Sequence, residues 1–326
     1  MQQLEQQVMR TRGVLRRAWS RFGVTRPDLV APARLVLQLD DPNVSHSAGS
    51  GEPLSIPEWR DAIASVVERW GPVPVTVLAH RTASDAEAIA AVRFAHRLEC
   101  PTLLVTDGTG VTDAIADELV GGGLDSVRVI VGGVSDGIQL KTVGNTASQA
   151  TGTVASFLSS RARVSESLDV EVAIPWVDGV TAELTAIIGW AQEAGVDGFR
   201  LVAPYRAERL PADPELLDHV IDAAQGFCRN GPIGIEELHA MVAHQDGEPG
   251  LARHHARRRF KCPVGGQRIV VGQRRNVYSC PFHKPIGVLH GDLAEVWSNA
   301  GEHFRRIVEC KRACVHTQLA PEPILG

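Results

Sequence analysis

The sequence predicts an α/β fold in which a partial (β/α)6 barrel precedes a small C-terminal cysteine-rich domain. Two observations support this expectation. Short apolar runs alternate with amphipathic helical segments along the middle of the chain, and four of the six cysteines lie in the last fifth of its 326 residues. Apolar strands separated by such helices are typical of a parallel sheet covered by helices. With 44% hydrophobic and 22% charged residues, the chain can bury a full core, which excludes general disorder.

The six predicted strands are short apolar runs bounded by polar or small residues. They cover residues 35–39, 73–79, 101–106, 125–131, 168–174 and 198–203. Apolar residues at helical spacing predict helices between them. These cover residues 56–70, 84–98, 112–121, 148–160 and 181–194. Ser84 with Glu87 is a predicted capping box at the start of the second helix, and Gly195 is a predicted C-cap.

The segment after the first strand helps to decide between two fold classes, a barrel and a nucleotide-binding doubly wound sheet. Leu39 continues as Asp40-Asp41-Pro42, whereas a dinucleotide-binding sheet has G-x-G-x-x-G at this place. We therefore favour the barrel, over residues 34–210.

Four cysteines form the strongest candidate metal site: Cys262, Cys280, Cys310 and Cys314. The first two bracket a predicted hairpin, with strands at residues 268–271 and 276–279, so they meet at its open end. The other two follow a helix predicted over residues 293–308 and have the spacing C-x3-C. Four thiolates can hold a [4Fe-4S] cluster or one Zn²⁺, and the spacing leaves both open. Cys100, at a strand start, is a predicted core thiol.

Charge is unevenly distributed along the chain. The net charge is -5, yet residues 253–284 hold nine Lys or Arg and no acid, and residues 1–34 hold seven Arg against two acids. The basic residues around the cysteines suit a cluster with four thiolates, because its net charge is negative. No apolar run approaches the roughly 18 residues of a membrane span, and the first residues lack the apolar core of a secretory signal. We expect a cytoplasmic protein.

Four local sequences, taken in order, resemble a known family. They are SAGSGEPLSIPEW at residues 47–59, LLVTDGTG at 103–110, LDSVRVIVGGVSDG at 124–137 and VDGFRLVAPYRAER at 196–209. Together with the cysteine segment, they resemble radical SAM enzymes that carry a C-terminal twitch or SPASM-type iron–sulfur domain. The resemblance covers about residues 34–318. It implies one auxiliary [4Fe-4S] cluster at the four cysteines and makes Zn²⁺ the alternative.

Two departures from this family bear on function. The family binds its catalytic cluster with C-x3-C-x2-C after the first strand, whereas this chain reads DDPNVSHSAG from Asp40 and has no cysteine there. The family's G-G-E after the second strand binds the SAM amino group, whereas this chain has Leu78-Ala79-His80-Arg81. We therefore expect neither SAM binding nor radical SAM catalysis by this chain alone.

Polar residues at the predicted carboxyl ends of the strands are the remaining candidates, because function gathers at this end of a barrel. Polar loop ends are also common where nothing is bound. The candidate catalytic residues are Asp40, Asp41, His80 and Arg81. The candidate substrate-binding residues are Asp107, Trp176, Tyr205 and Arg206. His80 and Arg81 add positive charge, which would favour an anionic ligand.

The predicted organisation has four parts: a basic amphipathic helix within residues 1–33, the barrel at 34–210, a basic connection at 211–260 and the metal-binding domain at 261–326. We expect a degenerate radical SAM-like protein that pairs, as a heterodimer, with an active radical SAM protein in peptide or small-molecule biosynthesis. The alternatives are a SAM-independent enzyme that uses the barrel rim, and a zinc-stabilised module for peptide or RNA. The basic run RRRFK lacks interleaved aromatic residues, so nucleic acid is not the favoured partner.

Overall fold

The computed structural model of the chain describes residues 31–40, 53–175, 177–202, 268–279 and 285–300. The apolar stripe of the predicted N-terminal helix, the connection at residues 211–260 and the four C-terminal cysteines lie outside these ranges.

All six predicted barrel strands are confirmed, with bounds that shift by one or two residues. They are β1 (Arg34–Gln38), β2 (Val75–Leu78), β3 (Thr102–Thr106), β4 (Ser126–Ile130), β5 (Asp169–Pro175) and β6 (Gly198–Val202). Neighbours in sequence are neighbours in the sheet, and every pair from β1 to β6 is parallel. A strand order that never reverses, joined by right-handed crossovers, places all the helices on one face. This is the arrangement of a partial barrel rather than a doubly wound sheet.

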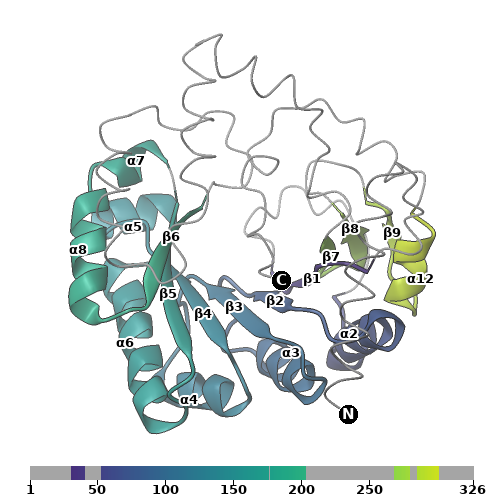
Figure 1. Cartoon of the computed structure of the whole chain (residues 1–326). Helices are drawn as coiled ribbons and strands as arrows, with labels where there is room; N and C mark the ends of the chain where they lie inside the picture. The colour runs from purple at the N-terminus through teal and green to yellow at the C-terminus, as the bar shows by residue number, and fades with distance from the viewer. Residues whose placement is uncertain (1–30, 41–52, 176, 203–267, 280–284, 301–326) are drawn as a thin grey trace, which may run out of the picture.

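The helices lie on the outer side of the curved sheet (Figure 1). The helices that match the predicted ones are α2 (Ile56–Trp70), α3 (Ala86–Arg97), α4 (Asp113–Gly121), α6 (Ala147–Arg163) and α8 (Leu184–Ala194). Two short helices were not predicted, α5 (Asp136–Thr142) and α7 (Asp178–Thr181). The predicted helix at residues 293–308 begins as α12 (Leu293–Ser298), and its last part lies outside the described residues.

The capping found at α3 and α2 differs from the predicted capping. The box at Ser84 and Glu87 is wrong, because α3 begins after Asp85, whose side chain makes no capping hydrogen bond. A box is present instead at α2, where the Ser55 amide donates to Glu58 Oε2 at 2.9 Å. Gly195 does end α8 in the left-handed conformation, with φ of 78°.

The predicted hairpin extends the barrel sheet. It consists of β7 (Arg268–Gly272) and β8 (Asn276–Tyr278), which pair antiparallel, and β9 (Gly287–Val288) follows at the edge. Strand β7 pairs in parallel with β1 over its whole length. The hairpin turn is also fixed to α2, because Leu54 donates its amide to the Gln273 carbonyl at 2.9 Å and Arg275 forms an ion pair with Glu58. Hydrogen bonds from Arg275 and Ser55 lower the pKa of Glu58 to about 2.

The two faces of the sheet differ in chemistry. Alternate strand residues face the helices and join one apolar core with them, which includes Leu35, Val77, Leu104, Val127 and Val172. Cys100 is buried in this core, as predicted. The residues between them face the inside of the barrel, as expected from strand alternation.

A buried ion triad lies on the inner face of the sheet. Arg128 and Arg200 both donate through Nε to Glu171 Oε2, at 2.6 and 2.8 Å. The exposed fractions of the Arg128, Arg200 and Glu171 side chains are 16%, 4% and 12%. Burial raises the pKa of Glu171, but the hydrogen bond from Arg200 and the two positive charges outweigh it, so the pKa is lowered. The two ion pairs that join β4, β5 and β6 therefore depend on an ionised Glu171.

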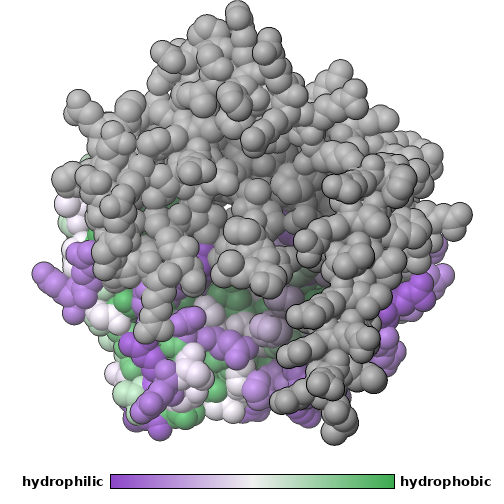
Figure 2. Space-filling model, viewed as in Figure 1, coloured by the Kyte–Doolittle hydropathy of each residue, from purple (hydrophilic) through white to green (hydrophobic). Residues whose placement is uncertain are grey.

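The described residues visible in Figure 2 include both hydrophilic and hydrophobic ones. Four large apolar residues are exposed among the described ones: Val134, Leu140, Val164 and Val288. Within the described residues, no helix combines the length and the hydrophobicity that crossing a membrane requires.

Replacing Glu171 by Gln tests the triad. We expect Glu171→Gln to lower the free energy of unfolding by about 3 kcal/mol at pH 7, because two buried guanidinium groups lose their carboxylate. The lowered pKa stabilises the fold above the usual value of 4.5, and this contribution is lost as the pH falls below it. The gap between the wild type and the variant should therefore close in acid. Urea unfolding from pH 7 to pH 3 measures it, with exposed Glu166→Gln as the control; a gap independent of pH would contradict the assignment.

Candidate functional site

Asp40 fixes the first turn of the rim at the carboxyl end of β1. Its Oδ1 accepts the His80 amide at 3.0 Å and lies 3.2 Å from His80 Nδ1. Its Oδ2 accepts the Arg81 amide at 2.6 Å. Burial raises the pKa of Asp40, but the hydrogen bonds from His80 and Arg81 outweigh it and the pKa is lowered. One ionised carboxylate at the end of β1 thus holds the loop after β2.

Arg81 extends from that loop toward the end of β3. Its Nε lies 3.7 Å from Asp107 Oδ2, an ion pair between a largely exposed cation and a carboxylate that is 3% exposed. Burial raises the pKa of Asp107 even though hydrogen bonds from Thr109 and the nearby charges of His80 and Arg81 oppose the change. A Cβ on Gly144, whose φ is +98°, would lie 2.7 Å from Arg81 Nη2. Glycine at position 144 therefore leaves room for this guanidinium.

A buried hydrogen-bond network beneath the rim joins the ends of β3 and β4. Gln139, on α5, accepts the amides of Gly132 and Gly133 at 2.7 and 3.0 Å and donates to Asn145 Oδ1 at 2.6 Å. Asn145 in turn donates to the Asp107 carbonyl at 2.5 Å. Each polar atom named here has a partner, so the network fixes the backbone from which Asp107 projects.

Glu183, which precedes α8, holds the loop that follows the two glycines after β4. It accepts the Val134 and Ser135 amides at 2.7 and 3.0 Å and bonds the Ser135 hydroxyl. Burial raises the pKa of Glu183, and these bonds outweigh it and lower the pKa. The sequence analysis did not single out Gln139, Asn145 or Glu183.

The structure brings four of the eight rim candidates together: Asp40, His80, Arg81 and Asp107. They form two neighbouring pairs, a hydrogen-bonded one of His80 with Asp40 and an ion pair of Arg81 with Asp107. The positive charge expected here is therefore accompanied by two carboxylates, one of which pairs with Arg81. The other candidates, Asp41, Trp176, Tyr205 and Arg206, lie outside the described residues, as do Cys262, Cys280, Cys310 and Cys314.

This arrangement can orient an imidazole, because a carboxylate hydrogen-bonded to one ring nitrogen fixes how the other is presented. It also places a partly exposed His80 and Arg81 at one edge of the sheet, where a substrate could contact both. Among the residues that the structure describes, no three His, Cys, Asp or Glu side chains are grouped so as to hold a metal ion.

Comparisons with known proteins support the fold. The structure of Streptococcus suis SuiB aligns with a TM-score of 0.59 at 9% identity, over 84% of this chain and 67% of SuiB. Its complex with S-adenosylmethionine gives 0.60 at 10% identity, over 84% of this chain and 65% of SuiB. Native anSMEcpe with bound AdoMet gives 0.58 at 13% identity, over 89% of this chain and 88% of anSMEcpe.

These neighbours are radical SAM enzymes, so the likeness supports the radical SAM-like fold predicted from the sequence. At identities of 9–13% it shows the fold alone. No family model and no curated protein matches the sequence.

Removing the Asp40 carboxylate tests its anchoring role. We expect Asp40→Ala to lower the free energy of unfolding by about 1–3 kcal/mol at pH 7, because the His80 and Arg81 amides lose their acceptor. Chemical denaturation measures the change. The control is Asp61→Ala on the exposed side of α2, which should cost less than about 0.5 kcal/mol. Equal effects of the two substitutions would show that Asp40 does not hold the loop.

Proposed function

We propose that this chain is a radical SAM-like protein that does not cleave SAM itself and serves as partner subunit of an active radical SAM enzyme. In this proposal the four C-terminal cysteines hold one auxiliary [4Fe-4S] cluster, and the barrel holds or helps to position a substrate. The reaction would belong to peptide or small-molecule biosynthesis.

The observation that carries the proposal is the position of Asp40. It lies two residues after the end of β1 and accepts the His80 and Arg81 amides. In the family that the sequence resembles, the segment after the first strand supplies three cysteines, whereas residues 40–52 contain none. Thiolates are the ligands on which such clusters depend, so the first strand leads into a segment without ligands for a catalytic cluster.

The residues after β2 also do not fit SAM. The SAM amino group is a cation, and the resemblance implies a carboxylate for it at this point. Here the chain presents Arg81, a cation, and the nearby carboxylate Asp107 already faces that guanidinium at 3.7 Å. Because Asp107 is paired with Arg81 and Asp40 accepts the His80 and Arg81 amides, both carboxylates are already engaged, which supports a rim without bound SAM.

The cysteine segment supports the second half of the proposal. Two cysteines at the ends of a hairpin and a C-x3-C pair supply four thiolates, a donor set that suits a [4Fe-4S] cluster. Such a cluster carries single electrons when bound. Because all four positions are then protein thiolates, we expect electron relay or support of the fold rather than substrate binding at iron.

The fold neighbours indicate the substrate class for this proposal. SuiB has been crystallised with the precursor peptide SuiA, and anSMEcpe with a peptide named Cp18Cys. A peptide is therefore the first substrate to test, and we propose that it lies along the edge of the sheet that carries His80 and Arg81.

The test is anaerobic purification of the chain alone and co-expressed with a radical SAM protein encoded beside it that has an intact C-x3-C-x2-C. We expect a brown protein with about four irons per chain, as four thiolates around one cubane imply. Iron should be lost in Cys280→Ser and in Cys310→Ser and retained in Cys100→Ser, the matched control in the core. We expect the two proteins to co-elute and the partner's turnover to fall when this chain is omitted.

Three outcomes would contradict the proposal. A colourless protein with about one zinc per chain would favour the zinc-stabilised module. Two proteins that neither co-elute nor affect each other's turnover would exclude the partner role. Turnover by the isolated chain that His80→Ala abolishes would favour the SAM-independent enzyme, since the 3.2 Å contact of His80 Nδ1 with Asp40 suits an acid–base residue.

A further inference from the structure

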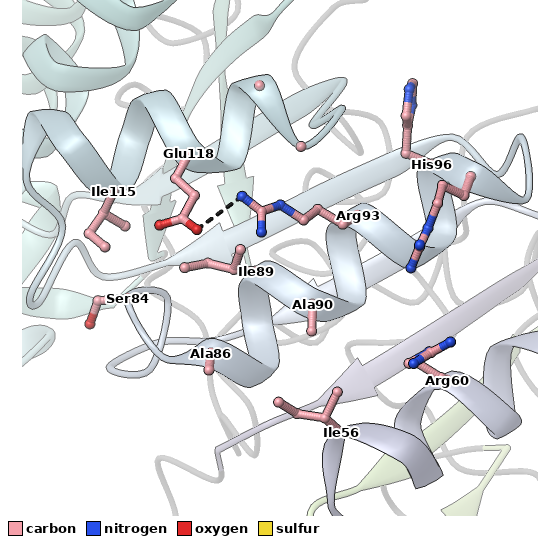
Figure 3. A pocket seen from close by; sticks show the side chains of 13 residues that line it. Ile56, Arg60, Ser84, Ala86, Ile89, Ala90, Arg93, His96, Ile115 and Glu118 are labelled. Atoms are coloured by element: carbon pink, nitrogen blue, oxygen red, sulfur yellow. Dashed lines mark hydrogen bonds and ion pairs between the residues drawn. The ribbon is translucent and has the colours of Figure 1, made fainter.

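An open groove of about 840 Å³ crosses the outer helices. Figure 3 shows its lining residues on three helices that lie side by side, with α3 between α4 and α2. α4 packs more closely against α6 than against α3, which leaves the space between α3 and α4 open. The groove lies on the outer surface of the barrel and contains none of the rim residues Asp40, His80, Arg81 and Asp107.

The charged lining of the groove is mainly positive. It contains Arg60, Arg93, His96 and Arg97 against one acid, Glu118. Glu118 is already paired, because Arg93 Nη2 lies 2.9 Å from its Oε1. In the described part of the chain, neither Arg60 nor Arg97 has a carboxylate partner. Two unneutralised guanidinium groups therefore face the groove.

Both of these guanidinium groups are held by the same aromatic ring. The Arg60 and Arg97 guanidinium carbons lie 4.9 and 5.5 Å from the centre of the Phe94 ring. Stacking on an aromatic face leaves the N–H groups at the edge of the guanidinium available and limits its motion. The two donors are thereby pre-organised, which lowers the cost of ordering them when a carboxylate binds.

The glycines that end α4 make room for the other basic side chains. A Cβ on Gly122 would lie 2.8 Å from Arg93 Cγ, and one on Gly123 would lie 2.1 Å from the His96 ring. Larger residues at these positions would displace Arg93 and His96. The glycine run therefore does more than end a helix, since it lets both side chains pack against the backbone.

Apart from Ser84 and two glycines, the rest of the lining is apolar. It includes Ile56 from α2, Ile89 from α3 and Ile115 from α4, together with the small residues Ala86 and Ala90. A ligand that fits this surface needs apolar side chains beside its negative charges. A nucleic-acid backbone or a lipid headgroup provides closely spaced phosphates, which the Glu118 carboxylate would oppose, whereas a peptide can place its carboxylates away from it.

We propose that this groove binds an acidic, amphipathic segment of a partner protein. Carboxylates of the segment pair with Arg60 and Arg97, and its apolar side chains lie on Ile89 and its neighbours. Arg–carboxylate pairs of this kind are among the stronger polar contacts in interfaces. The proposal is independent of the function proposed for the rim, because it rests on a different surface and on different residues.

The test uses a fluorescein-labelled helical peptide with leucines on one face and glutamates on the other, and fluorescence anisotropy against the full-length chain. We expect the double variant Arg60→Gln/Arg97→Gln to bind about tenfold more weakly or worse, which corresponds to about 1.4 kcal/mol. Binding should also weaken as salt is raised. Both arginines are exposed, so the variant should fold as the wild type does, which circular dichroism verifies.

Arg163→Gln is the matched control. Arg163 pairs with Asp117 of α4 at 2.8 Å and is 46% exposed, much as Arg93 pairs with Glu118 at 2.9 Å and is 51% exposed, but it lies outside the groove. The affinity of the Arg163→Gln variant for the peptide should stay within about twofold of the wild type. Comparing it with the double variant corrects for binding by basic segments elsewhere. Equal affinities of the double variant and the control would overturn the proposal. So would equal binding of a peptide with glutamines in place of glutamates, or tighter binding of a single-stranded oligonucleotide that the double substitution weakens.

Discussion

Strand β1 is the element on which the described structure depends. It pairs in parallel with β2 on one side and with β7, more than 200 residues later in the chain, on the other. These two pairings place the beginning of the barrel and the hairpin before the last cysteines in one sheet. They also fix the position of Asp40, because the carboxyl end of β1 can point only to the edge where β2 and β3 end as well.

The rim is organised by the carboxylates that follow these strands. Asp40 bonds the backbone after β2, Asp107 faces Arg81, and Glu183 bonds the loop after β4. Each carboxylate is engaged with a neighbouring element of the same chain. These carboxylates are already engaged before any ligand arrives, which fits a surface that holds a substrate better than one that binds a cationic cofactor.

The sequence was sufficient for the barrel strands and most helices because their apolar residues repeat with the period of each element. It was not sufficient for α5, which has seven residues, begins with Asp136-Gly137 and buries only Gln139. The N-cap of α3 was ambiguous, because Ser84 and Asp85 are both good N-cap residues. At α2, the spacing of Ser55 and Glu58 is that of a capping box and could have identified it. The pairing of β7 with β1 could not be predicted, because alternation shows that a strand exists but not which edge it joins. The positions directly after predicted strands identified Asp40, His80, Arg81 and Asp107 as candidates. The buried partners Gln139 and Asn145 have no such position, so the sequence pattern did not identify them.

We propose that the barrel keeps a radical SAM-like fold without the reaction. The most direct test incubates the anaerobically purified chain, with its iron content measured, with SAM and dithionite and then quantifies 5′-deoxyadenosine by mass spectrometry. We expect no 5′-deoxyadenosine above a protein-free blank, even when the chain is fully loaded with iron. Formation of 5′-deoxyadenosine in excess over the protein would contradict it and would mean that a catalytic cluster binds without the expected cysteines.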